Sequence, residues 1–289
     1  MRKWCFLFIC IGLIVLLFYC FFPSQGTDIQ LGNGLFSWQP NVLDSEECQN
    51  LFSHMKEWGL NDLYQSVPAQ AELSQVQSFL RKAAEQNITV YLLTGDPNWG
   101  LDESGSAMVE EIARVAKYNE GLEPEQQFRG LILDVEPYLT AEWQQNDTAV
   151  MASYVAAMKK AKNAATDASL TLIACIPYFY DTIGQEEGLT QLVQEGCDGI
   201  AVMNYYKEQE LEHISTELAL ASDYRKPLVN IYELQPPGLH GLTEYNTYYQ
   251  EGWNGVMQSW QSLQQQISYA QFSFAIHHYI ALQEVMGFE

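Results

Sequence analysis

Phe128-Arg-Gly-Leu-Ile-Leu-Asp-Val-Glu-Pro-Tyr138 is an apolar stretch that ends in two carboxylates. Its apolar run predicts a buried β-strand, and Pro137, which cannot donate a hydrogen bond to a neighbouring strand, predicts where that strand ends. Residues two apart in a strand point to the same face, so Asp134 and Glu136 are expected to project together while Val135 faces the other way. A strand that is apolar on both faces is typical of a parallel sheet covered by helices. The stretch therefore predicts an α/β fold with its chemistry at the carboxyl end of this strand.

The same strand-then-helix pattern repeats along the chain. Strands are expected at 34–39, 60–67, 89–94, 128–136, 169–176, 199–205, 227–234 and 272–279. Apolar residues at helical spacing predict helices between them, among them a long helix capped by Thr140 and helices at 189–193, 211–220 and 245–267. Each right-handed crossover places the next parallel strand beside the last, so eight such units over about 250 residues predict a closed (β/α)8 barrel, the TIM barrel. An open doubly wound sheet is the alternative, although no glycine-rich phosphate loop follows the first strand.

The amino-terminal segment differs in composition from the rest. Trp4 to Phe22 is an uncharged apolar run long enough to cross a bilayer, and Arg2 and Lys3 precede it. The basic end is expected to stay in the cytoplasm. We therefore expect residues 1–26 to be a signal anchor or signal peptide and residues 27–289 to form the barrel. The barrel would then be extracellular on a single-pass anchor in the cell membrane, or secreted if cleavage follows the small residues near Gly26.

Charge and cysteine content exclude some functions. The chain has 36 acidic and 14 basic residues and a formal net charge of −22, so its surface repels phosphate backbones and we expect no nucleic-acid partner. Of the six cysteines, Cys48, Cys175 and Cys197 lie beyond the apolar run, and none shows metal-ligand spacing. We expect neither a metal nor a cofactor. Cys175 falls in a predicted strand and is expected to be a small core residue.

Polar and aromatic residues at the carboxyl ends of the predicted strands are the candidate site residues, because barrel enzymes build their sites there. Carboxylates among aromatic rings favour carbohydrate chemistry, since acids act on glycosidic bonds and flat rings stack on sugar faces. His277 and His278 alternate along a strand, so at most one is expected to line the barrel. The candidates are Trp38, Asp96, Trp99, Asp134, Glu136, Tyr178, Asn204, Tyr205, Tyr206, Glu233 and His278.

Two segments resemble family 18 glycoside hydrolases, the chitinase and endo-β-N-acetylglucosaminidase family. Segment 198–205 is similar to that family's strand-six sequence, which ends Met-x-Tyr-Asp. The family's strand-four motif reads Asp-x-x-Asp-x-Asp-x-Glu. The residues that resemble that strand are Phe128, Gly130, Leu131, Leu133, Asp134 and Glu136.

The resemblance implies a role for three of the candidates. Glu136 would be the general acid, Asp134 would orient the substrate acetamido group that acts as internal nucleophile, and Tyr205 would hydrogen-bond that group. The chain departs from the family pattern at three places. Arg129 and Ile132 replace the first two aspartates of the strand-four motif, and Tyr206 replaces the aspartate after Tyr205.

A second, weaker resemblance is to the large clan of retaining glycosidases, which carries an acid/base on strand four and a glutamate nucleophile on strand seven. Glu136 and Glu233 would take these roles, although Val135 stands where that clan usually has Asn. We therefore expect an exported glycoside hydrolase that cleaves a polysaccharide or oligosaccharide. The family 18 resemblance implies that this substrate contains an N-acetylhexosamine. The alternative is a barrel that binds glycan at the cell surface without cleaving it. A metal-dependent hydrolase is disfavoured because no histidine-rich set is visible.

Overall fold

Eight parallel strands close into a barrel in the computed structural model, which describes residues 29–43 and 45–287. Each strand pairs with the next along the chain, and β1 pairs with β8 through Gly34 and Ala275. The predicted (β/α)8 barrel is confirmed, and the closing pair excludes the open doubly wound sheet. The strands are β1 (Gly34–Ser37), β2 (Asp62–Ser66), β3 (Thr89–Thr94), β4 (Gly130–Asp134), β5 (Thr171–Pro177), β6 (Gly199–Met203), β7 (Leu228–Glu233) and β8 (Phe272–His277).

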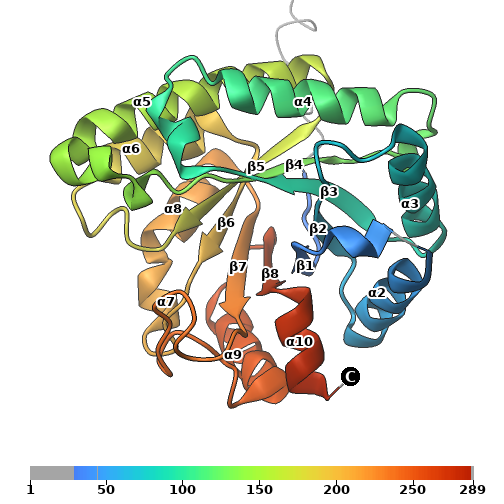
Figure 1. The fold of residues 1–289 in the computed structure, drawn as a ribbon. Helices are drawn as coiled ribbons and strands as arrows, with labels where there is room; N and C mark the ends of the chain where they lie inside the picture. The colour runs from blue at the N-terminus through green and yellow to red at the C-terminus, as the bar shows by residue number, and fades with distance from the viewer. Residues whose placement is uncertain (1–28, 44, 288–289) are drawn as a thin grey trace, which may run out of the picture.

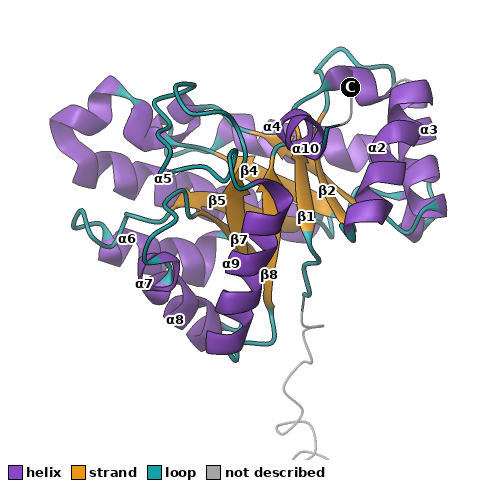
Figure 2. Ribbon diagram, turned by 90° about the horizontal axis from the view of Figure 1, so that it is seen from below, coloured by secondary structure: helices purple, strands orange, loops and turns teal. Residues whose placement is uncertain are grey.

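Helices surround the strands on the outside of the barrel (Figures 1 and 2). Thr140 caps the longest of them as predicted, because its hydroxyl oxygen accepts a hydrogen bond from the backbone N–H of Trp143. The helices are α2 (Ser45–Trp58), α3 (Leu73–Glu85), α4 (Ser106–Asn119), α5 (Ala141–Asp167), α6 (Glu186–Gln191), α7 (Glu210–His213), α8 (Ser215–Tyr224), α9 (Gly252–Gln266) and α10 (Tyr279–Met286).

The barrel has an inner and an outer apolar layer, and β4 shows how the sequence separates them. Ile132 points into the barrel interior, where it packs among side chains such as Tyr91 and Ile173. Leu131 and Leu133 belong to the outer layer beneath the helices. The strand alternation that the sequence predicts is therefore observed, and it continues beyond β4, since Val135 is also buried in the outer layer.

Several elements are shorter than the apolar patterns predict. β1 stops at Ser37 because Pro40 begins a short 3-10 turn, and β8 stops at His277 because α10 begins at Tyr279. The helix expected at 245–267 begins only at Gly252, since residues 234–251 form a loop that contains prolines and glycines. The helix expected at 211–220 is divided into α7 and α8.

No helix among the described residues is long and apolar enough to cross a membrane. The predicted anchor, Trp4 to Phe22, lies outside the described residues. Its membrane insertion and its cleavage stay predictions.

Candidate active site

A cavity of about 640 Å³ opens at the carboxyl ends of the strands, where the sequence places the candidate residues. Residues after β1, β4, β5, β6, β7 and β8 contribute to its wall, together with the loop between β7 and α9. No Lys or Arg of the described residues lines it. Its polar and aromatic lining includes Trp38, Asp134, Glu136, Tyr138, Tyr178, Tyr205, Glu233, Gln235, His240, Asn246, His277 and His278.

Asp134 and Glu136 line this cavity together. Asp134 is the last residue of β4 and pairs with Cys175 of β5. The backbone after β3 passes close to it at Gly95, where an added Cβ would lie 1.9 Å from the carbonyl oxygen of Asp134. Glu136 follows two residues later, and the 3-10 turn Pro137–Leu139 carries Tyr138, whose hydroxyl donates a hydrogen bond to Oε2 of Glu136. The end of β4 therefore presents two carboxyl groups on a closely packed backbone.

The two acids influence each other's protonation. Burial raises the pKa of Glu136 above its ordinary value, and the negative charge of Asp134 raises it further. The hydrogen bond from Tyr138 and the nearby His277 act in the opposite direction on the pKa of Glu136. Burial also raises the pKa of Asp134, and His277 and the thiol of Cys175 offset only part of this rise. A raised pKa favours the protonated form of Glu136, which is the form that a general acid needs.

Asp134 has an open hydrogen-bonding position. Its Oδ1 is buried and accepts no hydrogen bond from the described residues. A buried carboxylate oxygen without a donor is costly, so it is well suited to accept a hydrogen bond from a bound ligand.

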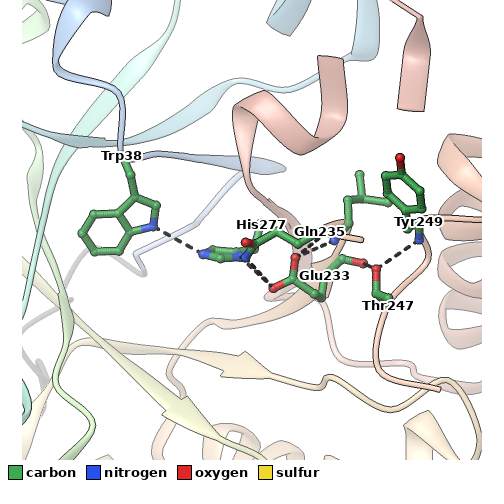
Figure 3. Close-up of polar contacts among 7 residues, drawn as sticks. Trp38, Glu233, Gln235, Thr247, Tyr249 and His277 are labelled. Carbon is green, nitrogen blue, oxygen red and sulfur yellow. Dashed lines mark hydrogen bonds and ion pairs between the residues drawn. The ribbon is translucent and has the colours of Figure 1, made fainter. Parts of the chain in front are cut away.

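Glu233, at the end of β7, is in a different environment. Its Oε1 accepts hydrogen bonds from the backbone N–H groups of Leu234 at 2.8 Å and Gln235 at 2.7 Å. Its Oε2 lies 2.8 Å from Nδ1 of His277 (Figure 3). The side chain is only 2% exposed. Both oxygens of Glu233 are thus engaged within the protein.

Both histidines at the end of β8 line the cavity, whereas strand alternation predicts at most one. The alternation fails because His277 is the last strand residue and His278 precedes α10. Burial lowers the pKa of His278 to about 4, and the neighbouring His277 contributes to this lowering. His278 is therefore a neutral ring near neutral pH. Its Nδ1 is buried and has no partner within the described part of the chain.

The loop at 234–251 closes one side of the cavity, which the sequence does not predict. Asn246 donates a hydrogen bond from Nδ2 to the carbonyl oxygen of Tyr205 at 2.7 Å. The hydroxyl of Thr247 donates to the carbonyl oxygen of Glu233 at 3.2 Å and accepts from the backbone N–H of Tyr249 at 3.1 Å (Figure 3). These bonds fasten the loop to the ends of β6 and β7.

A row of aromatic rings leads away from Glu136. The ring of Tyr178 stacks on His213 with centroids 4.6 Å apart, and Tyr206 stacks on Tyr245 at 6.4 Å. Edge contacts of 5.2 to 5.7 Å join the rest, and Tyr245 is 49% exposed. We call this set the aromatic strip; its members, in order, are Tyr138, Phe179, Tyr178, His213, Tyr206 and Tyr245.

Four candidate residues do not line the cavity. Asp96 caps a 3-10 turn by accepting a hydrogen bond from the backbone N–H of Asn98, and Trp99 packs against the outer apolar layer. Asn204 is buried in the barrel wall, and Tyr206 belongs to the part of the aromatic strip that lies beyond the cavity. The candidates that do line the cavity are Trp38, Asp134, Glu136, Tyr178, Tyr205, Glu233 and His278.

Tyr138, Gln235 and Phe179 line the cavity but are not among the predicted residues. The position of Tyr138 two residues after Glu136 is a signal that could have identified it. No group of three His, Cys, Asp or Glu side chains in residues 29–43 and 45–287 could hold a metal ion.

Comparison with solved structures finds similar barrels at low sequence identity. A family 18 chitinase from Pseudoalteromonas aurantia shares 10% identity over 89% of this chain and 99% of that one, with a TM-score of 0.56. A Bacteroides thetaiotaomicron protein assigned as an α-L-fucosidase shares 13% sequence identity over 90% of this chain and 92% of that one, with a TM-score of 0.60. A broad-specificity endoglucanase from an uncultured bacterium shares 12% sequence identity over 86% of each chain, with a TM-score of 0.55. The sequence matches no protein-family model and no curated protein. These likenesses show the fold.

Proposed function

We propose that this chain is a glycoside hydrolase that uses Glu136 as its general acid. The observation that carries the proposal is a carboxyl group of raised pKa, next to a second carboxyl group, in an open cavity at the carboxyl end of a barrel strand. Protonated Glu136 would donate its proton to the glycosidic oxygen as the bond between that oxygen and the anomeric carbon breaks.

Asp134 supports a substrate-assisted reaction. Its unpartnered Oδ1 can accept a hydrogen bond from the N–H of a substrate acetamido group. That contact would turn the acetamido oxygen toward the anomeric carbon, where it acts as the internal nucleophile, as the family 18 resemblance implies. Tyr205 lines the same cavity, at a position suited to hold that group. We therefore propose an N-acetylhexosamine at the bond that is cut.

Glu233 is a poor candidate for the nucleophile of a double displacement. Attack on an anomeric carbon would need one of its carboxylate oxygens, and both already accept hydrogen bonds, from two backbone amides and from His277. We propose instead that Glu233 anchors the histidine next to it.

The surface supports a neutral glycan as substrate. The net charge of −22 disfavours anionic polymers, and the aromatic strip offers rings of the kind that stack on sugar faces. Because this strip begins at Tyr138, which contacts the proposed acid, a glycan chain could lie on it with one linkage at Glu136.

Measurement of new reducing ends tests the proposal. The full-length chain would be incubated with oligosaccharides of N-acetylglucosamine, with peptidoglycan fragments and with neutral glucans. Replacing Glu136 with Gln is expected to lower turnover by about 10³-fold, since it removes the proton donor and keeps the shape of the side chain. The matched control is Glu125→Gln, an exposed acid just before β4, which should leave turnover unchanged. Near-normal turnover in the Glu136→Gln variant would eliminate the mechanism.

A second candidate function is glycan binding without cleavage. It is favoured by the residues that replace family acids, above all Ile132, whose side chain is packed in the apolar barrel interior. Oligosaccharide binding by calorimetry, with no reducing ends released from any glycan, would establish this candidate in place of the hydrolase.

We also propose that the barrel acts outside the cytoplasmic membrane, since Arg2 and Lys3 precede the apolar run. Fractionation of cells and determination of the mature amino terminus test this. A full-length chain in the cytoplasmic fraction would refute export.

A further inference from the structure

A chain of hydrogen bonds runs from β7 through β8 to the residues after β1. Nδ1 of His277 lies 2.8 Å from Oε2 of Glu233, and the indole N–H of Trp38 donates to Nε2 of His277 at 3.3 Å (Figure 3). An indole N–H can only donate, so Nε2 must be the accepting nitrogen of the ring. Nδ1 of His277 is then the nitrogen that donates to Glu233.

Glu233 fixes the ring of His277. Two backbone amides hold Oε1 of Glu233, and the side-chain amide of Gln235 reaches Oε2 at 3.4 Å. A carboxylate held in this way sets both the orientation and the tautomer of the histidine it accepts from. The imidazole cannot turn without breaking this contact.

Other elements confine the ring of His277 as well. Phe36 of β1 meets its ring at 5.7 Å, Tyr205 after β6 lies at 6.1 Å, and His278 lies at 5.1 Å. The charged or titratable groups around it are Glu233, His278 and the two acids of β4, Asp134 and Glu136, with which it interacts electrostatically.

The other end of the hydrogen-bond chain orients Trp38. This side chain is half-buried, packs against the inner apolar layer and lines the cavity. Its N–H edge is held by His277, which leaves the faces of the indole available for contact with a ligand. An indole face is among the best surfaces for stacking on a sugar ring.

We propose that His277 is a positioning residue that, backed by Glu233, holds the Trp38 indole in place as the sugar platform of the cavity. The role of Trp38 as a sugar platform rests on the proposed function, whereas its attachment to His277 does not.

The attachment is tested by NMR of the full-length chain labelled with ¹⁵N at the tryptophan indoles. The Trp38→Phe variant identifies the resonance of Trp38. This resonance should move in His277→Phe, which removes the acceptor of the indole N–H. In His277→Gln it should stay close to its wild-type position, because a Gln amide can accept from Trp38 and donate to Glu233. The indole of Trp253, on the outer side of the barrel, is the internal control.

Binding separates the positioning role from a merely structural one. In the Glu136→Gln background, affinity for a tetrasaccharide of N-acetylglucosamine should fall about tenfold in His277→Phe, and His277→Gln should retain it. In the active enzyme, His277→Phe should raise KM about tenfold and change kcat less than about threefold.

A Trp38 resonance that is unchanged in His277→Phe would overturn the proposal. Equal affinity of His277→Phe and His277→Gln for the tetrasaccharide would do the same. If no glycan is bound or cleaved, the proposed function fails, and the NMR comparison still decides whether His277 holds Trp38. If His277→Phe does not fold, His277→Asn, whose amide is too short to bridge Glu233 and Trp38, takes its place.

Discussion

Glu136 has two close neighbours with opposite effects on its acidity. The charge of Asp134 raises the pKa of Glu136, whereas the hydrogen bond from Tyr138 lowers it by stabilising the carboxylate. If Glu136 is the general acid, catalysis needs its protonated form and is lost as the pH rises through its pKa. These two neighbours therefore set the alkaline limit of activity.

Removing each neighbour should move that limit in opposite directions. Tyr138→Phe removes the hydrogen bond and raises the pKa of Glu136, so the alkaline limb of kcat/KM moves to higher pH. Asp134→Asn removes the negative charge and lowers this pKa, so the limb moves to lower pH, in addition to any loss of turnover. Profiles of kcat/KM against pH measure both shifts. A shift of both variants in the same direction would contradict the assignment of this limb to Glu136.

Among the elements, strands were more predictable than loops. Apolar runs such as 89–94 identified all eight strands, because a strand covered on both faces must be apolar throughout. Strand ends also located the acid pair, Tyr205 and Glu233 at the cavity. The loop at 234–251 was predicted in part as helix, since loop conformation depends on contacts such as that of Asn246 with Tyr205, which have no periodic signature.

Helix α8 carries an acid that no pattern identifies as buried. Glu217 is 0% exposed, and neither of its carboxyl oxygens has a partner among the described residues. Burial raises the pKa of Glu217 to about 8, and the charge of Asp181 contributes to this. The helix packs against β6 and β7, so this carboxyl group lies against the barrel wall.

Glu217 should make the barrel less stable as the pH rises. Its folded pKa of about 8 exceeds the ordinary value of 4.5, so the unfolded chain ionises first and stability falls between these two values. Glu217→Gln removes this titration. The Tm of the variant should exceed that of wild type by an amount that grows from about pH 5 to about pH 8. At pH 8 the free energy of unfolding should be larger by on the order of a few kcal/mol. Calorimetry measures the difference, with the exposed Asp223→Asn on the same helix as control. A constant difference in Tm across this range would show that Glu217 is ionised in the folded protein.

At the scale of the whole molecule, loops from separate parts of the chain form one surface. The aromatic strip takes its rings from the segments after β4, β5, β6 and β7, and it starts at the proposed acid. The acidic surface and this strip together favour a neutral chain of several sugars over a single sugar or a polyanion. Burial lowers the pKa of His213, which favours the uncharged form of this member of the strip.

The far end of the aromatic strip should contribute only to the binding of long substrates. Tyr245→Ala removes an exposed ring that stacks on Tyr206, and it should weaken binding of a hexasaccharide by about threefold to tenfold, or ~1 kcal/mol, while leaving a disaccharide unaffected. Calorimetry in the Glu136→Gln background measures affinity without hydrolysis. Tyr245→Trp should restore the affinity, and Ile280→Ala, which removes a comparably exposed apolar side chain from α10, should change nothing. If Tyr245→Ala weakened both ligands equally, the ring would support the cavity itself, and if it weakened neither, the glycan would follow another path across the barrel.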